Sequence, residues 1–144
     1  MPKFTEKKTL PYSPAQVFDL VVDVARYPEF LPWCKGARLY NVKESQFDAD
    51  VMIGFKLFRE RFTSRVTYTP GVSVDVDYIR GPMKTLYNHW RFRNAPDGGC
   101  LIDFEVDFEF KSRVLEELIG SHFEKTCHKM MAAFEARAAE LYGS

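Results

Sequence analysis

Few side chains in this sequence belong to types that do chemistry, and histidine is the first to consider. The chain has 3 histidines. His122 and His128 are six positions apart in a segment with helical periodicity, so their side chains point in different directions. His89 falls on the charged side of an alternating segment, together with Arg91. These residues do not form the ligand set of a metal site, and we expect no metal.

Cysteine is the second such type. Cys34, Cys100 and Cys127 are far apart and form no CxxC pair, so neither a disulfide framework nor a structural zinc site is indicated. Cys34 follows two prolines and could be a nucleophile, but no histidine is placed near it by the sequence pattern, and we interpret it as a small packed thiol. The GxSxG, P-loop and GxGxxG motifs do not occur. We therefore predict a protein that is not an enzyme and has no cofactor.

Charged side chains alternate in sign from one extended segment to the next. The positions that share the outer faces of these segments are Arg61, Arg65, Asp75, Asp77, Arg91, Arg93, Asp103, Glu105, Asp107 and Glu109. Neighbouring strands would present opposite charges to each other, and each such pair on a wet surface contributes a few tenths of a kcal/mol. We prefer this interpretation to a catalytic pair of carboxylates.

The overall composition excludes several classes of protein. Lys plus Arg number 20 and Asp plus Glu also 20, so no general field favours nucleic acid or an anionic membrane. No window approaches the roughly 20 apolar residues of a membrane span, and the N-terminal segment has no apolar run of signal-peptide length. We expect a cytoplasmic, monomeric protein that does not bind DNA directly.

The elements that would position any site follow from hydrophobic periodicity. Residues 13–16 form a helix start with a capping box, and an apolar stripe predicts a helix from about residue 14 to about residue 24. From about residue 37 to 110 the period changes to two, with turns that separate about six antiparallel strands. The segment "KFTEKKTL" near the N-terminus could add one more strand. A stripe from Leu115 to Leu141 predicts a last helix of about 30 residues.

These elements predict an α+β fold in one domain of residues 1–144, in which a curved antiparallel sheet of about 6–7 strands grips the long C-terminal helix. The aromatic content is 15%, with 13 Phe. A dry, empty hollow of roughly 300 to 1,000 Å³ between sheet and helix would cost on the order of 7 to 24 kcal/mol. The hollow must therefore be collapsed, wet, or occupied by an apolar guest, and its lining disfavours water. Collapse around the phenylalanines stays an alternative to a guest.

Few polar side chains are predicted to point into this hollow. They are Ser64, Tyr68, Tyr78 and Asn88. Hydroxyl and amide donors in an apolar pocket suit a ligand with one or two carbonyl oxygens. The alternative is that these groups bond to nearby backbone at the strand ends.

Four stretches of the chain resemble a known family. They are "DVARYPEFLPWC" (23–34), "GPMKTLYNHWRF" (81–92), "DGGC" (97–100) and "FEFKSRVLEELIG" (108–120). Over essentially its whole length the chain resembles the bacterial coenzyme Q-binding proteins of the START superfamily, which also carry the name ribosome-association toxin. The resemblance implies a START/Bet v 1-like helix-grip fold with a deep hydrophobic tunnel that binds ubiquinone or a similar polyisoprenoid lipid. It also implies a non-enzymatic role that supports quinone function in respiration, at the cytoplasmic side of the inner membrane.

Carried over residue by residue, the resemblance implies a mouth and a tunnel wall. The mouth and one wall would be formed by Tyr27, Pro28, Phe30, Leu31, Pro32 and Trp33. The tunnel lining would be formed by Val51, Ile53, Phe55, Phe62, Val66, Trp90, Phe92, Phe104, Phe123, Cys127 and Met130. The strand pattern adds Tyr78 and Asn88, the inward polar groups named above, to the candidate binding residues. Gly120 would either allow a bend in the last helix that admits the lipid or allow close contact between helix and sheet.

The stretch "YPEFLPWC" carries large apolar groups in a segment bounded by prolines. Pro28 can start and Pro32 can end a single short helical turn, so we expect a rigid segment. Phe30, Leu31 and Trp33 would then form a fixed lip over the end of the sheet. The alternative is a plain hydrophobic plug.

Two further functions stay open at this point. The toxin name implies binding to the ribosome that inhibits subunit association, although the balanced charge gives no sign of the basic face that RNA binding normally needs. Related helix-grip proteins include polyketide cyclases, and a cyclase-type enzyme would use the same cavity. Such an enzyme would need Tyr68, Tyr78 or His89 turned inward as an acid or base.

Overall fold

The computed structural model describes residues 3–31, 33–55, 58–120 and 123–143, without the side chains of residues 55, 58, 115, 118–120 and 123. Within these residues, seven strands and three α-helices follow one another with one 3-10 helix, η1. In chain order they are β1 (Lys3–Leu10), α1 (Pro14–Val22), η1 (Val24–Glu29), β2 (Cys34–Lys43), β3 (Gln46–Phe55), β4 (Phe58–Thr69), β5 (Ser73–Arg80), β6 (Met83–Asn94), β7 (Cys100–Phe110), α2 (Arg113–Gly120) and α3 (Phe123–Tyr142).

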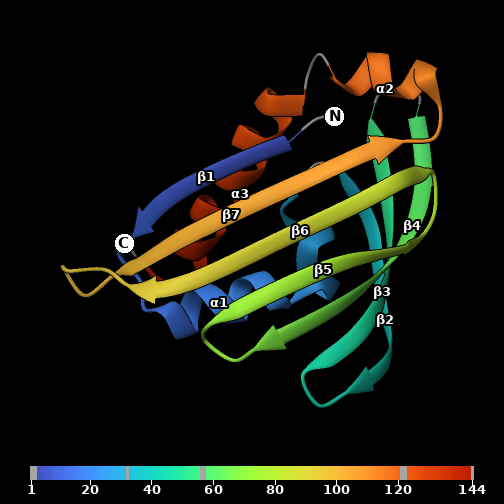
Figure 1. The fold of residues 1–144 in the computed structure, drawn as a ribbon. Helices are drawn as coiled ribbons and strands as arrows, with labels where there is room; N and C mark the ends of the chain where they lie inside the picture. Colours follow the sequence, from blue (N-terminus) through green and yellow to red (C-terminus); the bar gives the residue numbers. More distant parts are fainter. Residues whose placement is uncertain (1–2, 32, 56–57, 121–122, 144) are drawn as a thin grey trace.

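All strands belong to one antiparallel sheet with the order β1-β7-β6-β5-β4-β3-β2. The strands from β2 to β7 form a meander, and β1 joins the far edge beside β7, where Phe4 lies opposite Val106. The curved sheet keeps α1, η1 and α3 on one side (Figure 1). The predicted α+β helix-grip architecture is confirmed, including the additional N-terminal strand.

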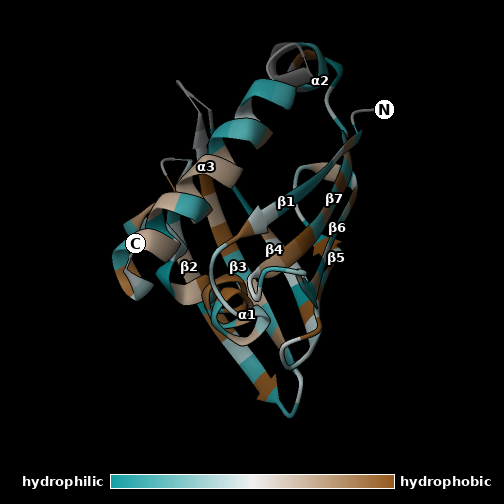
Figure 2. Cartoon of the chain, turned by 90° about the vertical axis from the view of Figure 1, so that its left-hand side faces the viewer, coloured by the Kyte–Doolittle hydropathy of each residue, from teal (hydrophilic) through white to brown (hydrophobic). Residues whose placement is uncertain are grey.

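The first helix begins as predicted and ends earlier. The hydroxyl of Ser13 accepts a hydrogen bond from the backbone N–H of Gln16 at 3.2 Å, and the Gln16 side chain accepts one from the backbone N–H of Ser13 at 3.0 Å. This is the predicted capping box. The helix stops at Val22 because Asp23 leaves the helical conformation, with a ψ of 64°. The apolar face of α1 lies inside the curve of the sheet, where Figure 2 shows the helix nearly end-on.

The C-terminal helical pattern forms two helices, so the predicted single helix of about 30 residues was wrong. The first of them ends at Gly120 and the second begins at Phe123. Glycine is the weakest helix former apart from proline, which favours an end of the helix at this position. The two helices run in different directions in Figure 1, and α3 is the one that lies across the concave face of the sheet. None of the described helices is long and apolar enough to cross a membrane.

The proline-bounded segment is helical, but its boundaries differ from the prediction. Pro28 lies inside η1, which begins at Val24, so it does not start the turn. The backbone N–H of Leu31 donates to the carbonyl of Tyr27 at 2.9 Å, which closes the end of the turn. Pro32, which was predicted to end it, lies outside the described residues.

The convex face of the sheet carries the predicted cross-strand ion pairs. Arg91 lies 2.8 Å from Asp75 on β5, and Arg93 lies 3.0 Å from Asp103 on β7. Cross-strand pairing is therefore confirmed for these positions.

A buried carboxylate on the same face was not singled out from the sequence. The side chain of Asp50 is buried and accepts hydrogen bonds from Thr63 at 2.6 Å, Tyr40 at 3.1 Å and Arg38 at 3.2 Å. The bond from Thr63 is the main cause that holds the pKa of Asp50 below its usual value. The carboxylate thus ties the edge strand β2 to β3 and β4.

Candidate ligand-binding cavity

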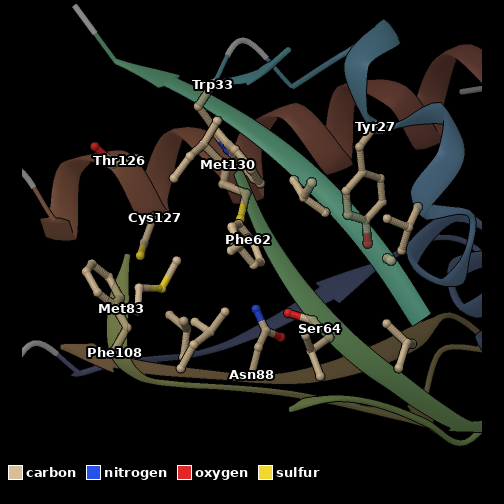
Figure 3. Close-up of a pocket in the computed structure, with 18 of the residues that line it drawn as sticks. Tyr27, Trp33, Phe62, Ser64, Met83, Asn88, Phe108, Thr126, Cys127 and Met130 are labelled. Atoms are coloured by element: carbon tan, nitrogen blue, oxygen red, sulfur yellow. The ribbon is translucent and has the colours of Figure 1, made fainter. Parts of the chain in front are cut away.

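An apolar cavity of about 240 Å³ lies between the concave face of the sheet and α3 (Figure 3). Strands β3 to β7 supply one side of it, and η1, the segment after η1 and α3 supply the other. The lining consists of Val24, Tyr27, Trp33, Ala49, Val51, Ile53, Gly54, Phe62, Ser64, Val66, Val74, Val76, Met83, Leu86, Asn88, Trp90, Val106, Phe108, Phe110, Thr126, Cys127, Met130 and Phe134. Most members are alternate residues of strands, as expected for the buried face of a pleated sheet.

Aromatic rings close the end of the cavity beside η1. The ring of Phe134 on α3 lies 5.1 Å from Trp90, 5.4 Å from Tyr27 and 5.3 Å from Phe30, in T-shaped arrangements that favour ring pairs. Tyr27 is held in place because its hydroxyl donates to the carbonyl of Val21. Burial raises the pKa of Tyr27, so this hydroxyl stays protonated. We call Tyr27, Phe30, Trp90 and Phe134 the aromatic wall. It presents ring surfaces to the cavity, and the hydroxyl of Tyr27 is not free to bind a ligand.

The salt link of Arg137 holds this wall from outside. Its guanidinium lies 2.6 Å from the carboxylate of Glu29 and 5.3 Å from the centre of the Phe30 ring. The Arg137 side chain is only 11% exposed, whereas that of Glu29 is 49% exposed, so water reaches the pair from the Glu29 side. The link joins α3 to η1 next to the aromatic cluster.

Two polar groups in the lining have no hydrogen-bond partner among the described residues. They are the hydroxyl of Ser64 and the side-chain carbonyl of Asn88, both completely shielded from solvent. Tyr78 differs, because its hydroxyl accepts a hydrogen bond from the backbone N–H of Met83 at 3.1 Å, and it does not line the cavity. Tyr68 packs between Phe18 and Phe47. The alternative of bonding to nearby backbone therefore holds for Tyr78 but not for Ser64 or Asn88.

The titratable groups near the cavity are poor candidates for acid, base or nucleophile. Burial raises the pKa of Cys127 to about 12, and Glu6 and Glu124 add to the effect. Burial also raises the pKa of Cys34, in accord with the predicted packed thiol. His89 lies on the convex face, 3.1 Å from Asp75, and burial lowers its pKa. No histidine or carboxylate occurs among the described lining residues.

Many of the residues predicted to bind a ligand meet in this cavity. Those that line it are Tyr27, Trp33, Val51, Ile53, Phe62, Val66, Asn88, Trp90, Cys127 and Met130. They come from η1, the segment after it, the three strands β3, β4 and β6, and α3. The predicted side chains of Phe55 and Phe123, and residue Pro32, lie outside the described parts of the chain.

Other predicted residues lie away from the cavity, and their neighbours give the reason. Phe92 is covered by Phe18 of α1 at 6.2 Å, and Phe104 is enclosed by Phe4 of β1 at 6.1 Å and by Trp90. The remaining members are Pro28, which is exposed, Leu31, which is buried in the core, Phe30, which packs on Phe134, and Tyr78. Phe92, Phe104 and Tyr78, which were predicted for the lining, do not line the cavity, and neither do Pro28, Phe30 and Leu31, which were predicted for the mouth and one wall.

Several residues that line the cavity were not predicted as binding residues. Among them are Ala49, Val74, Val76, Leu86, Val106, Phe108 and Phe110. Their period of two was visible, since each shares a strand face with a residue that was chosen. The helix residue Phe134 was likewise on the predicted apolar stripe. Ser64 was predicted to point inward but was not chosen as a binding residue.

A curved sheet around a C-terminal helix, with an apolar cavity between them, defines a START-like, helix-grip domain of lipid-binding type. Residues 10–135 match the family described as polyketide cyclase/dehydrase and lipid transport. The chain belongs to this family.

Two relatives with known names show which members of the family this chain is similar to. The chain is 38% identical over 146 residues to the ribosome association toxin RatA of Rickettsia prowazekii, across 98% of this chain and 99% of the relative. It is 33% identical over 148 residues to the mitochondrial coenzyme Q-binding protein COQ10 homolog B of Xenopus laevis, across 98% of this chain and 59% of the relative. The predicted relationship to coenzyme Q-binding and ribosome-association proteins is confirmed.

Solved structures support the same assignment. The 18 kDa protein CC1736 from Caulobacter crescentus matches with a TM-score of 0.81 and 38% identity, covering 100% of both chains. A START superfamily protein from Mycobacterium smegmatis has a TM-score of 0.80 at 17% identity, over 96% of this chain and 98% of its own. The Zhui aromatase/cyclase from Streptomyces sp. R1128 has a TM-score of 0.83 at 12% identity, over 95% of this chain and 93% of its own. The last two likenesses concern the fold alone.

Proposed function

We propose that this protein is a non-enzymatic binding protein for ubiquinone or a similar polyisoprenoid lipid, and that it supports quinone function in respiration. The observation that carries the proposal is the cavity between sheet and α3, lined almost entirely by apolar side chains. A lipid tail gains about 0.8 kcal/mol for each methylene group that such a lining removes from water.

The cost of an empty cavity supports an apolar occupant. At about 24 cal/mol per Å³, a dry cavity of about 240 Å³ costs about 6 kcal/mol. The whole free energy of unfolding of a domain is only about 5–15 kcal/mol. A lipid that fills the cavity recovers part of this cost, whereas water finds few polar partners there.

The relatives favour a quinone among apolar lipids. One of them is named for coenzyme Q binding, and the family description includes lipid transport. A protein with this role would collect and return its lipid through peripheral contact with the inner membrane. An enzymatic function of the cyclase type has less support, because the described lining offers no histidine or carboxylate.

Lipid extraction from the purified protein tests the proposal. Val76→Phe would fill the cavity from β5, whereas Ile79→Phe adds a ring to the outer face of the same strand, where Ile79 is 39% exposed. We expect quinone in extracts of the wild type and Ile79→Phe, and at least tenfold less in Val76→Phe. Circular dichroism would verify that all three are folded. Wild-type protein that carries no quinone and binds none when it is added would refute the proposal.

Binding to the ribosome is a second candidate, favoured by the names of several relatives. The equal numbers of basic and acidic residues argue against a large RNA-binding face. Sedimentation with purified ribosomal subunits at moderate salt tests it, and the Val76→Phe variant shows whether ribosome binding depends on the cavity.

A further inference from the structure

We infer that the cavity binds a ligand whose buried end carries a hydroxyl group, and that Asn88 and Ser64 form hydrogen bonds with it. The inference rests on the proposed function of the same cavity and adds the chemistry of the ligand's head. A phenol or hydroquinone on an apolar tail is the class of ligand that fits.

The unpaired polar atoms carry the inference. The hydroxyl oxygen of Ser64 and the carbonyl oxygen Oδ1 of Asn88 are shielded from solvent and lack a partner among the described residues. Ser64 as a whole is only 1% exposed. A buried polar group without a partner destabilises the folded protein, and in most proteins such groups are paired. Two of them in one apolar cavity indicate a partner that arrives with the ligand.

The positions of the two side chains suit a single head group. Ser64 lies on β4 opposite Tyr78 of β5, and Asn88 lies on β6 opposite Val76 of β5. One strand therefore separates them, which places their backbones on the order of 10 Å apart. Figure 3 shows both side chains directed into the cavity. Side chains that reach toward each other from this separation leave room for a small polar group between them.

The kinds of atom decide which head group fits. Asn88 Oδ1 can only accept a hydrogen bond, the amide nitrogen can only donate, and the hydroxyl of Ser64 can do either. A ketone, ester or ether can accept from Ser64 or from the amide nitrogen, but it has no hydrogen for Oδ1. A hydroxyl group can serve both sides. For a quinone lipid, the reduced form with two hydroxyl groups satisfies this site, and the oxidised form leaves Oδ1 unpaired.

A pair of redox-inert ligands tests the inference without interference from quinone chemistry. The probes are 4-nonylphenol and 4-nonylanisole, which differ in that a methyl group replaces the hydroxyl hydrogen. Trp33 and Trp90 line the cavity, so their fluorescence reports binding when excited at the red edge of tryptophan absorption. We expect the wild type to bind the phenol roughly tenfold more tightly, as the loss of one buried hydrogen bond implies.

Matched variants locate the effect. Asn88→Leu removes both polar atoms of the amide at similar size, and Ser64→Ala removes the hydroxyl. Asn94→Leu makes the same change as the first variant at an exposed position of β6 outside the cavity. The preference for phenol should fall to within about twofold in Asn88→Leu, weaken in Ser64→Ala, and stay at about tenfold in Asn94→Leu.

Thermal unfolding without ligand separates a binding role from a structural one. Since Asn88 Oδ1 is unpaired in the empty protein, Asn88→Leu should raise the melting temperature by about 3 °C or more. A lower melting temperature would mean that the amide is needed within the protein, and it would overturn the inference. Equal affinity of the wild type for phenol and anisole would overturn it too, while leaving the proposed lipid binding intact. Failure of both probes and of ubiquinone to bind would refute the proposed function itself.

Discussion

Truncation of Phe134 should expose how much of the stability depends on the aromatic wall of the cavity. Phe134 is 4% exposed and lies between Trp90 of the sheet and Tyr27 and Phe30 of the η1 segment. No other described residue of α3 has ring contacts with both of these parts. Its replacement by alanine therefore removes the ring contacts between α3 and the wall and leaves the salt link of Arg137.

The magnitude follows from the burial and the ring contacts. A change from Phe to Ala in a core costs about 3–5 kcal/mol, and the three T-shaped contacts place Phe134 in the upper half of this range. With a slope of about 2 kcal/mol per molar urea, Phe134→Ala should lower the midpoint of urea unfolding by about 2 M. Phe134→Leu, which keeps most of the volume, should cost about 1 kcal/mol.

The assay is equilibrium unfolding in urea, followed by tryptophan fluorescence and by circular dichroism. Leu141→Ala is the matched control on the same helix, because Leu141 is 50% exposed and should change the free energy of unfolding by less than about 0.5 kcal/mol. A shift for Phe134→Ala no larger than that of Leu141→Ala would refute the described packing of α3 on the wall.

Three further outcomes are expected. Asp50→Asn should lower the free energy of unfolding by about 1–2 kcal/mol at neutral pH, because it weakens the hydrogen bonds of the buried carboxylate. Since these hydrogen bonds depress the pKa of Asp50, the difference from wild type should shrink as the pH falls below about 4. Urea unfolding at a series of acidic pH values would measure this, and a difference that stays constant would contradict it. Because burial raises the pKa of Cys127 to about 12, Cys127 should react with a thiol reagent at pH 8 much more slowly in the folded protein than in the unfolded protein, and equal rates would contradict its burial. In a double-mutant cycle, Arg137→Met and Glu29→Gln should couple by about 1 kcal/mol, and additive effects would show that their contact contributes nothing.

The strands of this protein were predictable because the signal is local. Alternation along each strand and the turn residues between strands are properties of neighbouring positions, and the structure confirms the resulting meander. The break after Gly120 was less visible, since the apolar stripe continues on both sides of it. Periodicity predicts which face of a helix is buried, but it does not show where one helix stops and another begins.

The alternation along a strand shows which side chains point inward, but it does not show which of them line the cavity. Phe104 and Val106 have the same place in the alternation of β7, yet Phe104 is enclosed by Phe4 and Trp90 while Val106 lines the cavity. Phe92 is hidden by α1 in the same way. Which inward side chain meets the cavity is decided by elements that pack from elsewhere in the chain. The carboxylate of Asp50 was missed for a similar reason, since its partners come from two other strands, β2 and β4.

The pairing of β1 with β7 has a consequence for the order of folding. Lys3 lies opposite Asp107, so the first strand has no partner until the last strand is available. The C-terminal end of α3 also contacts the segment that follows β1, because Tyr12 donates to the carbonyl of Gly143 at 2.7 Å and Tyr142 donates to the carbonyl of Gln16 at 2.9 Å. Contacts between residues so far apart in the chain close large loops and slow the search for the native state. We therefore expect the central hairpins to form first and the N-terminal strand to dock late, so that a growing chain keeps its concave apolar face open until nearly all of it has been made.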